Sequence, residues 1–269
     1  MHSPRIHFIC FATKEYKKQA AKLALQAKKV SLFHSISIYS PETLPGLSTL
    51  IDQAANSRNL DYVSHREKLN AKHGYWIWKP FIILDLLDKI NDGDILLYAD
   101  SGCTLNVQNS QRLRLILELI RQVPNKNGVF FNLKRKISHY CSQKLLDKIS
   151  QENNFISTGK NSPLATYFVL KASSQSKEFV NRWLDLCKQN NFELLSGMID
   201  QHFPTHRHDQ SILAALLASN NSFESNFIFL EDESYPLERK YYSFISATRS
   251  KSFLLALKIY LNKAKDLLF

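Results

Sequence analysis

Three short clusters of polar residues carry the side chains that could do chemistry in this chain. The first is Asp100-Ser101-Gly102, which follows the apolar run at 95–99. Because Mg²⁺ and Mn²⁺ prefer oxygen ligands, a carboxylate at the end of a buried strand is a candidate ligand for such a cation. Gly102 would allow the backbone to approach a bound molecule closely. A turn without any functional role is the alternative, since Asp, Ser and Gly are common turn residues.

The second cluster is the segment GYWIWKP at 74–80, in which a tyrosine and two tryptophans surround Lys79. Pro80 suits the first turn of a helix, because its missing N–H has no intrahelical partner there. Anions are favoured near helix N-termini, so Lys79 is a candidate for binding a phosphate group. The alternative is a packed helix start, where the aromatic rings are buried and the lysine stem passes them to reach solvent.

The third cluster is HRHDQS at 206–211, directly before an apolar run. An imidazole beside a carboxylate could complete a metal or diphosphate site, or it could orient a hydroxyl group. The alternative is that Asp209 caps the helix that follows, because an Asp side chain can accept hydrogen bonds from the free N–H groups of a first helical turn.

The order of apolar runs predicts the elements that position these clusters. We expect a buried strand at 6–12, an amphipathic helix at 16–27 and a second strand at 32–39, and this β-α-β beginning indicates a parallel sheet. Ligands of open α/β sheets bind beyond the carboxyl ends of the strands, which is where Asp100 would lie. Further strands are expected at 95–100, 128–133, 165–173 and 226–234, and further helices at 80–90, 111–121, 179–187 and 209–218.

Composition limits both the class of protein and the class of partner. The 269 residues are 44% hydrophobic and 22% charged, and no linker divides them, so we expect one α/β domain over 1–250. The net charge of +11 favours an anionic partner: nucleic acid, a phosphate-bearing substrate or an acidic membrane surface. The four cysteines form no CxxC pair, which predicts a reducing compartment without disulfides or a thiolate zinc site. We expect neither a signal peptide nor a membrane span.

The tail at 251–269 is predicted to be a basic amphipathic helix, with leucines and Phe253 on one side and lysines between them. Such a helix can lie in a membrane interface against anionic lipids. The alternative is a helix that packs on the preceding domain or on a second subunit.

Taken together, the motifs resemble those of GT-A-type nucleotide-sugar glycosyltransferases, and most closely a bacterial polysaccharide-building group with GYWxWKP, GDxxxYxDxG and HDQS segments. These segments occur here in that order, at 74–80, 93–102 and 208–211. The resemblance covers residues 5–218 and extends more faintly to about 250. It implies a GT-A-like, Rossmann-type fold and a hexosyltransferase that moves a sugar from a nucleoside-diphosphate sugar to a saccharide or lipid-linked glycan acceptor. It also implies a cytoplasmic enzyme of lipopolysaccharide or capsule synthesis, placed on the inner face of the cytoplasmic membrane if the tail binds lipid.

The resemblance also implies roles for individual residues. Asp100 takes the position of the first aspartate of the family's DxD motif, which holds a divalent cation against the diphosphate. Asp209 and His208 would act at the sugar and acceptor side as catalytic residues. One basic residue among Arg239, Lys240 and Arg249 would close over the diphosphate. The donor-binding residues implied by the resemblance are Thr13, Trp76, Lys79, Asp100, Ser101, Gly102 and Gln210.

The chain departs from the family at Gly102, which stands where many members have the second aspartate. The expected cofactor is therefore Mn²⁺ or Mg²⁺ with one motif carboxylate absent. Asp100 would hold the cation with help from nucleotide phosphates and water, or a further ligand would come from the third cluster, with His206 the first candidate. Catalysis without a metal is the remaining alternative.

The stereochemistry and two competing functions also stay open. An inverting enzyme needs a base for the acceptor hydroxyl, and Asp209 is the candidate. HDQS-like segments also occur in retaining families, and retention is the favoured expectation. The alternatives to an active transferase are a basic nucleic-acid-binding protein, suggested by NLKRKISHY at 132–140, and a non-catalytic sugar-nucleotide-binding protein. We expect no nucleic-acid partner, because the stretch has only three clustered cations.

Overall fold

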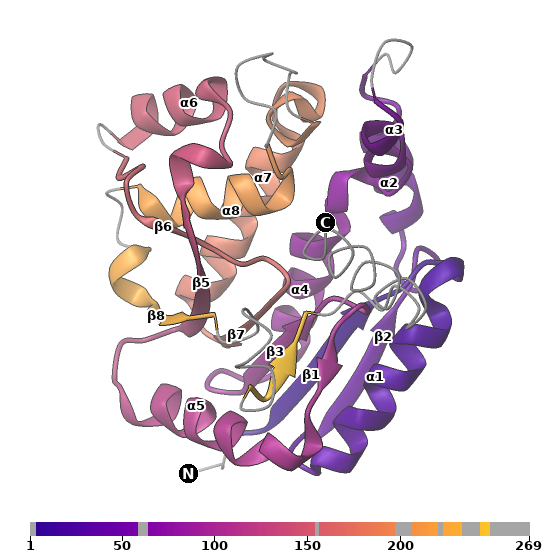
Figure 1. Cartoon of the computed structure of the whole chain (residues 1–269), viewed down its shortest axis with the longest axis vertical. Helices are drawn as coiled ribbons and strands as arrows, with labels where there is room; N and C mark the ends of the chain where they lie inside the picture. The colour runs from indigo at the N-terminus through magenta and orange to yellow at the C-terminus, as the bar shows by residue number, and fades with distance from the viewer. Residues whose placement is uncertain are drawn as a thin grey trace, which may run out of the picture.

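Figure 1 shows the computed structural model of the chain, which describes residues 4–58, 64–153, 156–196, 206–219, 223–232 and 243–247. The predicted C-terminal helix at 251–269 lies outside these residues. So do Arg239, Lys240 and Arg249, so the interpretations that depend on them stay predictions.

A seven-stranded sheet forms the centre of the fold, in the order β2-β1-β3-β7-β5-β6, with β8 paired to β5. Five strands run in one direction, and β7 and β6 run in the other. The predicted α/β class with an open, mainly parallel sheet flanked by helices is thereby confirmed. The strands are β1 Ile6–Phe11, β2 Ser35–Tyr39, β3 Ile95–Ala99, β5 Gly128–Lys136, β6 Asn161–Pro163, β7 Tyr167–Lys171 and β8 Ile228–Glu231.

Helices cover both faces of the sheet, because successive side chains of a strand point to opposite faces. One core lies between the sheet and helices α1 (Lys17–Val30) and α5 (Ser110–Gln122). In Figure 1, α1 lies beside β2, and α5 lies below the sheet. The other core lies against α4 (Trp78–Lys89), α7 (Ser174–Ser196) and α8 (Asp209–Ala218). Both faces are therefore apolar, as the continuous apolar runs predict.

The remaining elements are short and lie around these layers. Two short helices precede α4: α2 (Leu47–Ala55) and α3 (His65–Lys72), followed by the 3-10 helix η2 (Gly74–Trp76). Helix α6 spans Gln143–Asn153, and β4 (Thr104–Leu105) pairs with β9 (Ile245–Ser246). The other 3-10 helices are η1 Lys14–Tyr16, η3 Val107–Asn109, η4 Ile137–His139 and η5 Glu224–Asn226.

The four cysteines are all buried and unpaired. Across the described ranges, no helix is both long enough and apolar enough to span a bilayer.

The carboxyl ends of three neighbouring parallel strands, β2, β1 and β3, form one edge of the sheet. Phe11 of β1 is level with Tyr39 of β2, and Ile9 is level with Tyr98 of β3. The antiparallel strand β7 begins at the same edge, since Tyr167 pairs with Ala99. Residues that follow β1 and β3 and those that precede β7 are therefore brought together, and this is where the candidate site lies.

Candidate active site

Lys79 joins the three polar clusters. Its Nζ atom lies 2.7 Å from Oδ2 of Asp209 and 3.5 Å from Oδ1 of Asp100, and it donates a hydrogen bond of 2.9 Å to the carbonyl oxygen of Ala165. The Lys79 and Asp209 side chains are 3% and 5% exposed, whereas that of Asp100 is 30% exposed. Residues from a helix start, a strand end and a second helix start thus form one cluster, which we call the Lys79 cluster: Lys79, Asp100 and Asp209.

Burial and charge pull the pKa values of this cluster in different directions. Burial disfavours the charged form of Lys79, but the carboxylates of Asp100 and Asp209 outweigh it and raise the pKa of the ammonium group. Burial raises the pKa of Asp209 to about 6, with Lys79 opposing the shift and Asp100 adding to it. At pH 7 the cluster therefore holds one ammonium and two carboxylates, an excess of one negative charge.

Asp100 lies in a tight turn after β3. The turn residue and the carboxylate of the candidate site are therefore the same residue. Its carbonyl oxygen accepts a 2.9 Å hydrogen bond from the N–H of Cys103, and its own N–H donates to Thr166 at 2.8 Å. The fully buried Tyr98 donates its hydroxyl hydrogen to Oδ1 of Asp100. Within the described ranges, Oδ2 has neither a hydrogen bond nor an ion pair. This oxygen of the half-buried carboxylate is left for a ligand.

A divalent cation fits this arrangement through one protein oxygen. No group of three or more His, Cys, Asp or Glu side chains suited to a metal ion occurs in the part of the chain that the structure describes. Asp100 can offer Oδ2, and the excess negative charge of the Lys79 cluster would attract a cation. A metal held here would need further ligands from a bound substrate or from water.

Asp209 is the first residue of α8 and does not cap it. The N-cap position belongs to His208, and no side-chain cap hydrogen bond is made there. The interpretation of Asp209 as an N-cap is therefore wrong, because its carboxylate turns to Lys79. Trp183 of α7 fixes the same residue from the other side by donating Nε1–H to the Asp209 carbonyl oxygen at 3.1 Å. The expectation that the Lys79 stem passes the aromatic rings to reach solvent is wrong as well, because the side chain is enclosed.

His208 is enclosed by groups from three other segments. Its Nδ1 atom lies 3.0 Å from the carbonyl oxygen of Leu195, and its Nε2 atom lies 3.1 Å from Nδ2 of Asn70. Its ring centroid is 4.8 Å from that of Tyr75 and 5.6 Å from that of Trp76. The GYWIWKP and HRHDQS segments therefore meet twice, once through Lys79 and once through His208.

Gln210 and His206 lie on either side of these residues in the sequence. The Gln210 side chain is buried, and its Nε2 has no hydrogen-bond acceptor among the described residues. A buried donor without an acceptor is uncommon, and a bound ligand would satisfy it. His206 accepts a 3.3 Å hydrogen bond at Nδ1 from the N–H of Ser142, and burial lowers its pKa to about 4. Neither a hydrogen bond nor an ion pair joins His206 to Asp100 in the described ranges.

The other predicted donor-binding residues lie at the same edge of the sheet. Thr13 follows β1, whose last residue, Phe11, stacks on Trp78 with ring centroids 4.0 Å apart. Ser101 is buried within the turn after β3, and Gly102 is next to it. Trp76 is half-buried beside His208. All of them lie on segments that border the Lys79 cluster, and their contact with a donor stays a prediction.

Sequence reasoning missed four residues that hold the site together: Tyr98, Ala165, Trp183 and Asn70. Tyr98 carried a usable signal, because a residue two positions before Asp100 in a strand points to the same face. The contacts made by the other three join segments far apart in the chain, and nothing local to them indicates a partner.

No protein-family model matches the sequence, and no curated protein sequence matches it. Solved structures that resemble the chain include glycosyltransferases. One is a glycosyltransferase involved in glycosylation of the major capsid of PBCV-1, at 11% identity and a TM-score of 0.48, covering 93% of this chain and 95% of that chain.

Mouse xyloside xylosyltransferase 1 is similar at 10% identity and a TM-score of 0.42, covering 86% of each chain. The galactosyltransferase LgtC, solved in complex with donor and acceptor sugar analogs, is similar at 13% identity and a TM-score of 0.39, covering 83% of this chain and 72% of that chain. At this level of similarity, the case for a function depends on the residues of the site.

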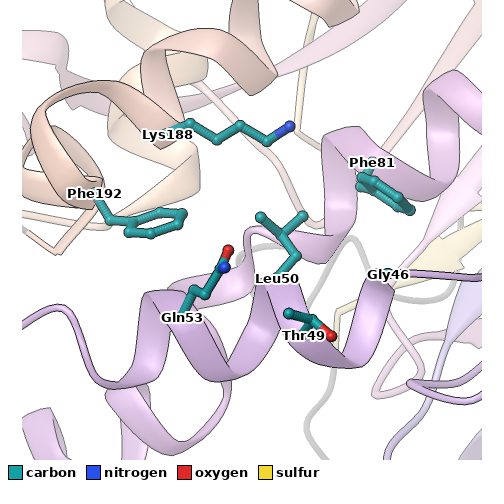
Figure 2. Close-up of a pocket in the computed structure, with 7 residues that line it drawn as sticks. All are labelled: Gly46, Thr49, Leu50, Gln53, Phe81, Lys188 and Phe192. Carbon is teal, nitrogen blue, oxygen red and sulfur yellow. The ribbon is translucent and has the colours of Figure 1, made fainter.

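A separate hollow lies between α2 and α7, with a volume of about 510 Å³. Figure 2 shows that the ring of Phe192 and the amide of Gln53 point toward one another across it, with Phe81 of α4 at its side. None of its lining residues belongs to the Lys79 cluster: Gly46, Thr49, Leu50, Gln53, Phe81, Lys188 and Phe192.

Proposed function

We propose that this chain is a glycosyltransferase that uses a nucleoside-diphosphate sugar as donor. The observation that carries the proposal is Lys79, whose ammonium group lies between Asp100 and Asp209 at the carboxyl edge of a mainly parallel sheet. The three motifs behind the family resemblance come from separate segments of the chain, yet they converge on one buried cation. If the three motifs were only a turn, a packed helix start and a helix cap, there would be no reason for their side chains to meet.

The donor is proposed to bind with its diphosphate beside Asp100. The Lys79 cluster carries one excess negative charge at pH 7, so it would repel a bare diphosphate. Mn²⁺ or Mg²⁺ would resolve this conflict, held by Oδ2 of Asp100 and by phosphate oxygens. Such a cation supplies stabilisation of the negative charge that grows on the departing diphosphate. Gly102 offers no second carboxylate, which leaves coordination positions for the donor and water.

The reaction is the exchange of one bond at the anomeric carbon. The bond to the diphosphate oxygen breaks with its electron pair on the leaving group, a bond to the acceptor hydroxyl oxygen forms, and the proton of that hydroxyl passes to an oxygen of the departing diphosphate. Asp209 is ionised at pH 7, since its pKa is about 6, and its negative charge would stabilise an oxocarbenium-like state. Gln210 has a free amide donor for a sugar hydroxyl.

Retention at the anomeric carbon is the stereochemistry that we propose. One oxygen of Asp209 is engaged by Lys79 at 2.7 Å, which suits a carboxylate that stabilises charge better than a base that must collect a proton. The proposed acceptor is a saccharide or a lipid-linked glycan in bacterial surface polysaccharide synthesis, in the cytoplasm or on the inner face of its membrane. The motif resemblance supports this part of the proposal.

The proposal is tested by thermal shift and donor turnover. UDP- and GDP-sugars with Mn²⁺ should raise the melting temperature of the wild-type chain, and Asp100→Asn should remove most of the shift. Asp88→Asn is the matched control, because Asp88 is 60% exposed and pairs only with Lys177 among the described residues. Absence of a shift with every donor would contradict the proposal.

The same preparation separates the alternatives. Release of nucleoside diphosphate in the presence of an acceptor identifies a transferase, and donor binding without release identifies a non-catalytic binder. The basic residues Lys134, Arg135 and Lys136 are exposed at the end of β5 and are available to a nucleic acid. A nucleic-acid-binding protein would show salt-sensitive binding to DNA or RNA.

A further inference from the structure

Two segments with unusual backbone conformations pack against each other beside the Lys79 cluster. Gly74, Tyr75 and Trp76 have φ angles of 57°, 49° and 63°, and His208 has φ 50° and ψ −119°. Residues other than glycine rarely adopt positive φ, and such conformations persist where the surrounding structure holds them in place. Both segments belong to motifs that carry the proposed site.

The backbone of His208 forms the tight turn that leads into α8. The N–H of Gln210 donates a 3.0 Å hydrogen bond to the carbonyl oxygen of Arg207, so His208 is the second residue of a four-residue turn. Its angles match the second residue of a type II′ turn, a position dominated by glycine. A histidine here requires compensating contacts.

The ring of His208 makes those contacts at both nitrogens. The Leu195 carbonyl oxygen can only accept, so Nδ1 carries the proton and donates to it at 3.0 Å. The Asn70 amide nitrogen can only donate, so Nε2 accepts from it at 3.1 Å. The rings of Tyr75 and Trp76 cover the imidazole at 4.8 Å and 5.6 Å. With both nitrogens engaged by protein groups, the ring has no free lone pair for a substrate proton.

The turn decides where the next side chain goes. Asp209 follows His208 directly, and its carboxylate is directed at Lys79. The ψ angle of His208 sets the orientation of the peptide that begins Asp209, so a relaxed His208 would redirect this carboxylate.

We infer that His208 is a positioning residue whose ring, held by Asn70, Leu195 and the 74–76 turn, keeps a glycine-type backbone conformation and thereby aims Asp209 at Lys79. The structural part of this inference is independent of the reaction. Its effect on turnover rests on the proposed glycosyltransferase function.

The strain is tested by comparing His208→Gly with His208→Ala. Both variants lose the contacts of the ring, but only glycine accepts the backbone conformation without cost. His208→Gly should therefore melt several degrees above His208→Ala. Lys22 in the middle of α1 is the control site, where the glycine variant should melt below the alanine variant, the usual order in a helix. A higher melting temperature for His208→Ala than for His208→Gly would overturn the inference.

The positioning is tested by a crystal structure of His208→Ala, which loses the ring contacts and disfavours the backbone conformation, and by its kinetics. Loss of the contacts of the His208 ring should separate Nζ of Lys79 from the Asp209 carboxylate beyond 4 Å, against 2.7 Å in the intact chain. Donor turnover should fall at least tenfold in kcat, with little change in the KM of the donor. A pair that stays at its original distance, with unchanged kcat, would overturn the inference. A wild-type chain without transferase activity, together with a separated pair in the variant, would overturn the proposed function and leave the inference standing.

Discussion

The ammonium nitrogen of Lys79 lies 2.7 Å from Oδ2 of Asp209, and almost no surface of either side chain is exposed to water. Each residue is the reason that the other can be buried, because an isolated charge in a protein interior is strongly disfavoured. Asp100 reaches the same ammonium group from the solvent side. The pair therefore ties the carboxyl edge of the sheet to the start of α8, and the predictions below follow from it.

Replacement of Lys79 by methionine should destabilise the fold strongly. The variant keeps a stem of similar length but leaves the buried Asp209 carboxylate without its cation, and loss of one partner of a buried pair costs about 3–5 kcal/mol. Urea denaturation measures the free energy of unfolding. Lys89→Met is the control, since Lys89 is 60% exposed in its pair with Asp85 and should lose less than about 1 kcal/mol. Equal losses in the two variants would contradict the account.

Asp209 should make the stability of the chain depend on pH between about 4 and 6. Its pKa rises from 3.8 to about 6 on folding, so the folded chain binds a proton there that the unfolded chain has released. Stability from this group is full below pH 4 and is lost as the pH rises through 6, by on the order of 2–3 kcal/mol. The difference in unfolding free energy between wild type and Asp209→Asn should fall over this window.

Taking the difference removes the opposite contribution of His206. Burial lowers the pKa of His206 to about 4, so its contribution to stability rises with pH over the same range in both proteins. A difference that is flat from pH 4 to pH 7 would show that Asp209 titrates as it does in an unfolded chain.

Tyr98 should contribute to stability through its hydroxyl group. The ring is fully buried, and the hydroxyl donates to Oδ1 of Asp100. Tyr98→Phe removes only this donor, and a hydrogen bond to a charged group is worth about 1.5–3 kcal/mol. Tyr16→Phe is the control, because Tyr16 is 44% exposed and its hydroxyl can be hydrated in either state. If both variants unfold at the same urea concentration, Asp100 does not depend on this donor.

Gly74 is required by space as well as by conformation. A Cβ atom at Gly74 would lie 3.0 Å from the carbonyl oxygen of Ile51, and φ is 57°. Gly46 also has a positive φ, 77°, but a Cβ atom there would have nothing within 4 Å. Gly46→Ala should cost about 1–2 kcal/mol from the backbone alone, and Gly74→Ala should cost about 1–3 kcal/mol more from overpacking. Equal melting temperatures would show that α2 yields to the added methyl group.

The sequence predicted the elements that carry the site better than it predicted the contacts within it. Apolar runs located β1 and β3, and the position of Asp100 after a buried strand placed it at the carboxyl edge of the sheet. The ion pair between Lys79 and Asp209 depends on how α4 and α8 pack, and no local pattern specifies that.

The sequence did not predict the conformation of His208 either, because the contacts that hold it come from distant segments. Histidine gives no signal for a positive φ angle, and the groups that hold its ring, Asn70 and the Leu195 carbonyl, lie on separate helices. The break in α7 was missed as well: Gln189 has an extended ψ of 141°, and Asn190, Asn191 and Phe192 all have positive φ. Asparagine tolerates that region, but a pair of asparagines in an amphipathic helix does not by itself predict a break.

Asp100, held by Lys79 and Tyr98, is proposed to receive the diphosphate of a sugar nucleotide. The decisive experiment is a crystal structure of the chain with a nucleoside diphosphate sugar and Mn²⁺. We expect the cation in contact with Oδ2 of Asp100 and with phosphate oxygens, while Lys79 stays paired with Asp209. A nucleotide bound elsewhere, for example in the hollow between α2 and α7, with Asp100 making no contact to cation or phosphate, would contradict this proposal.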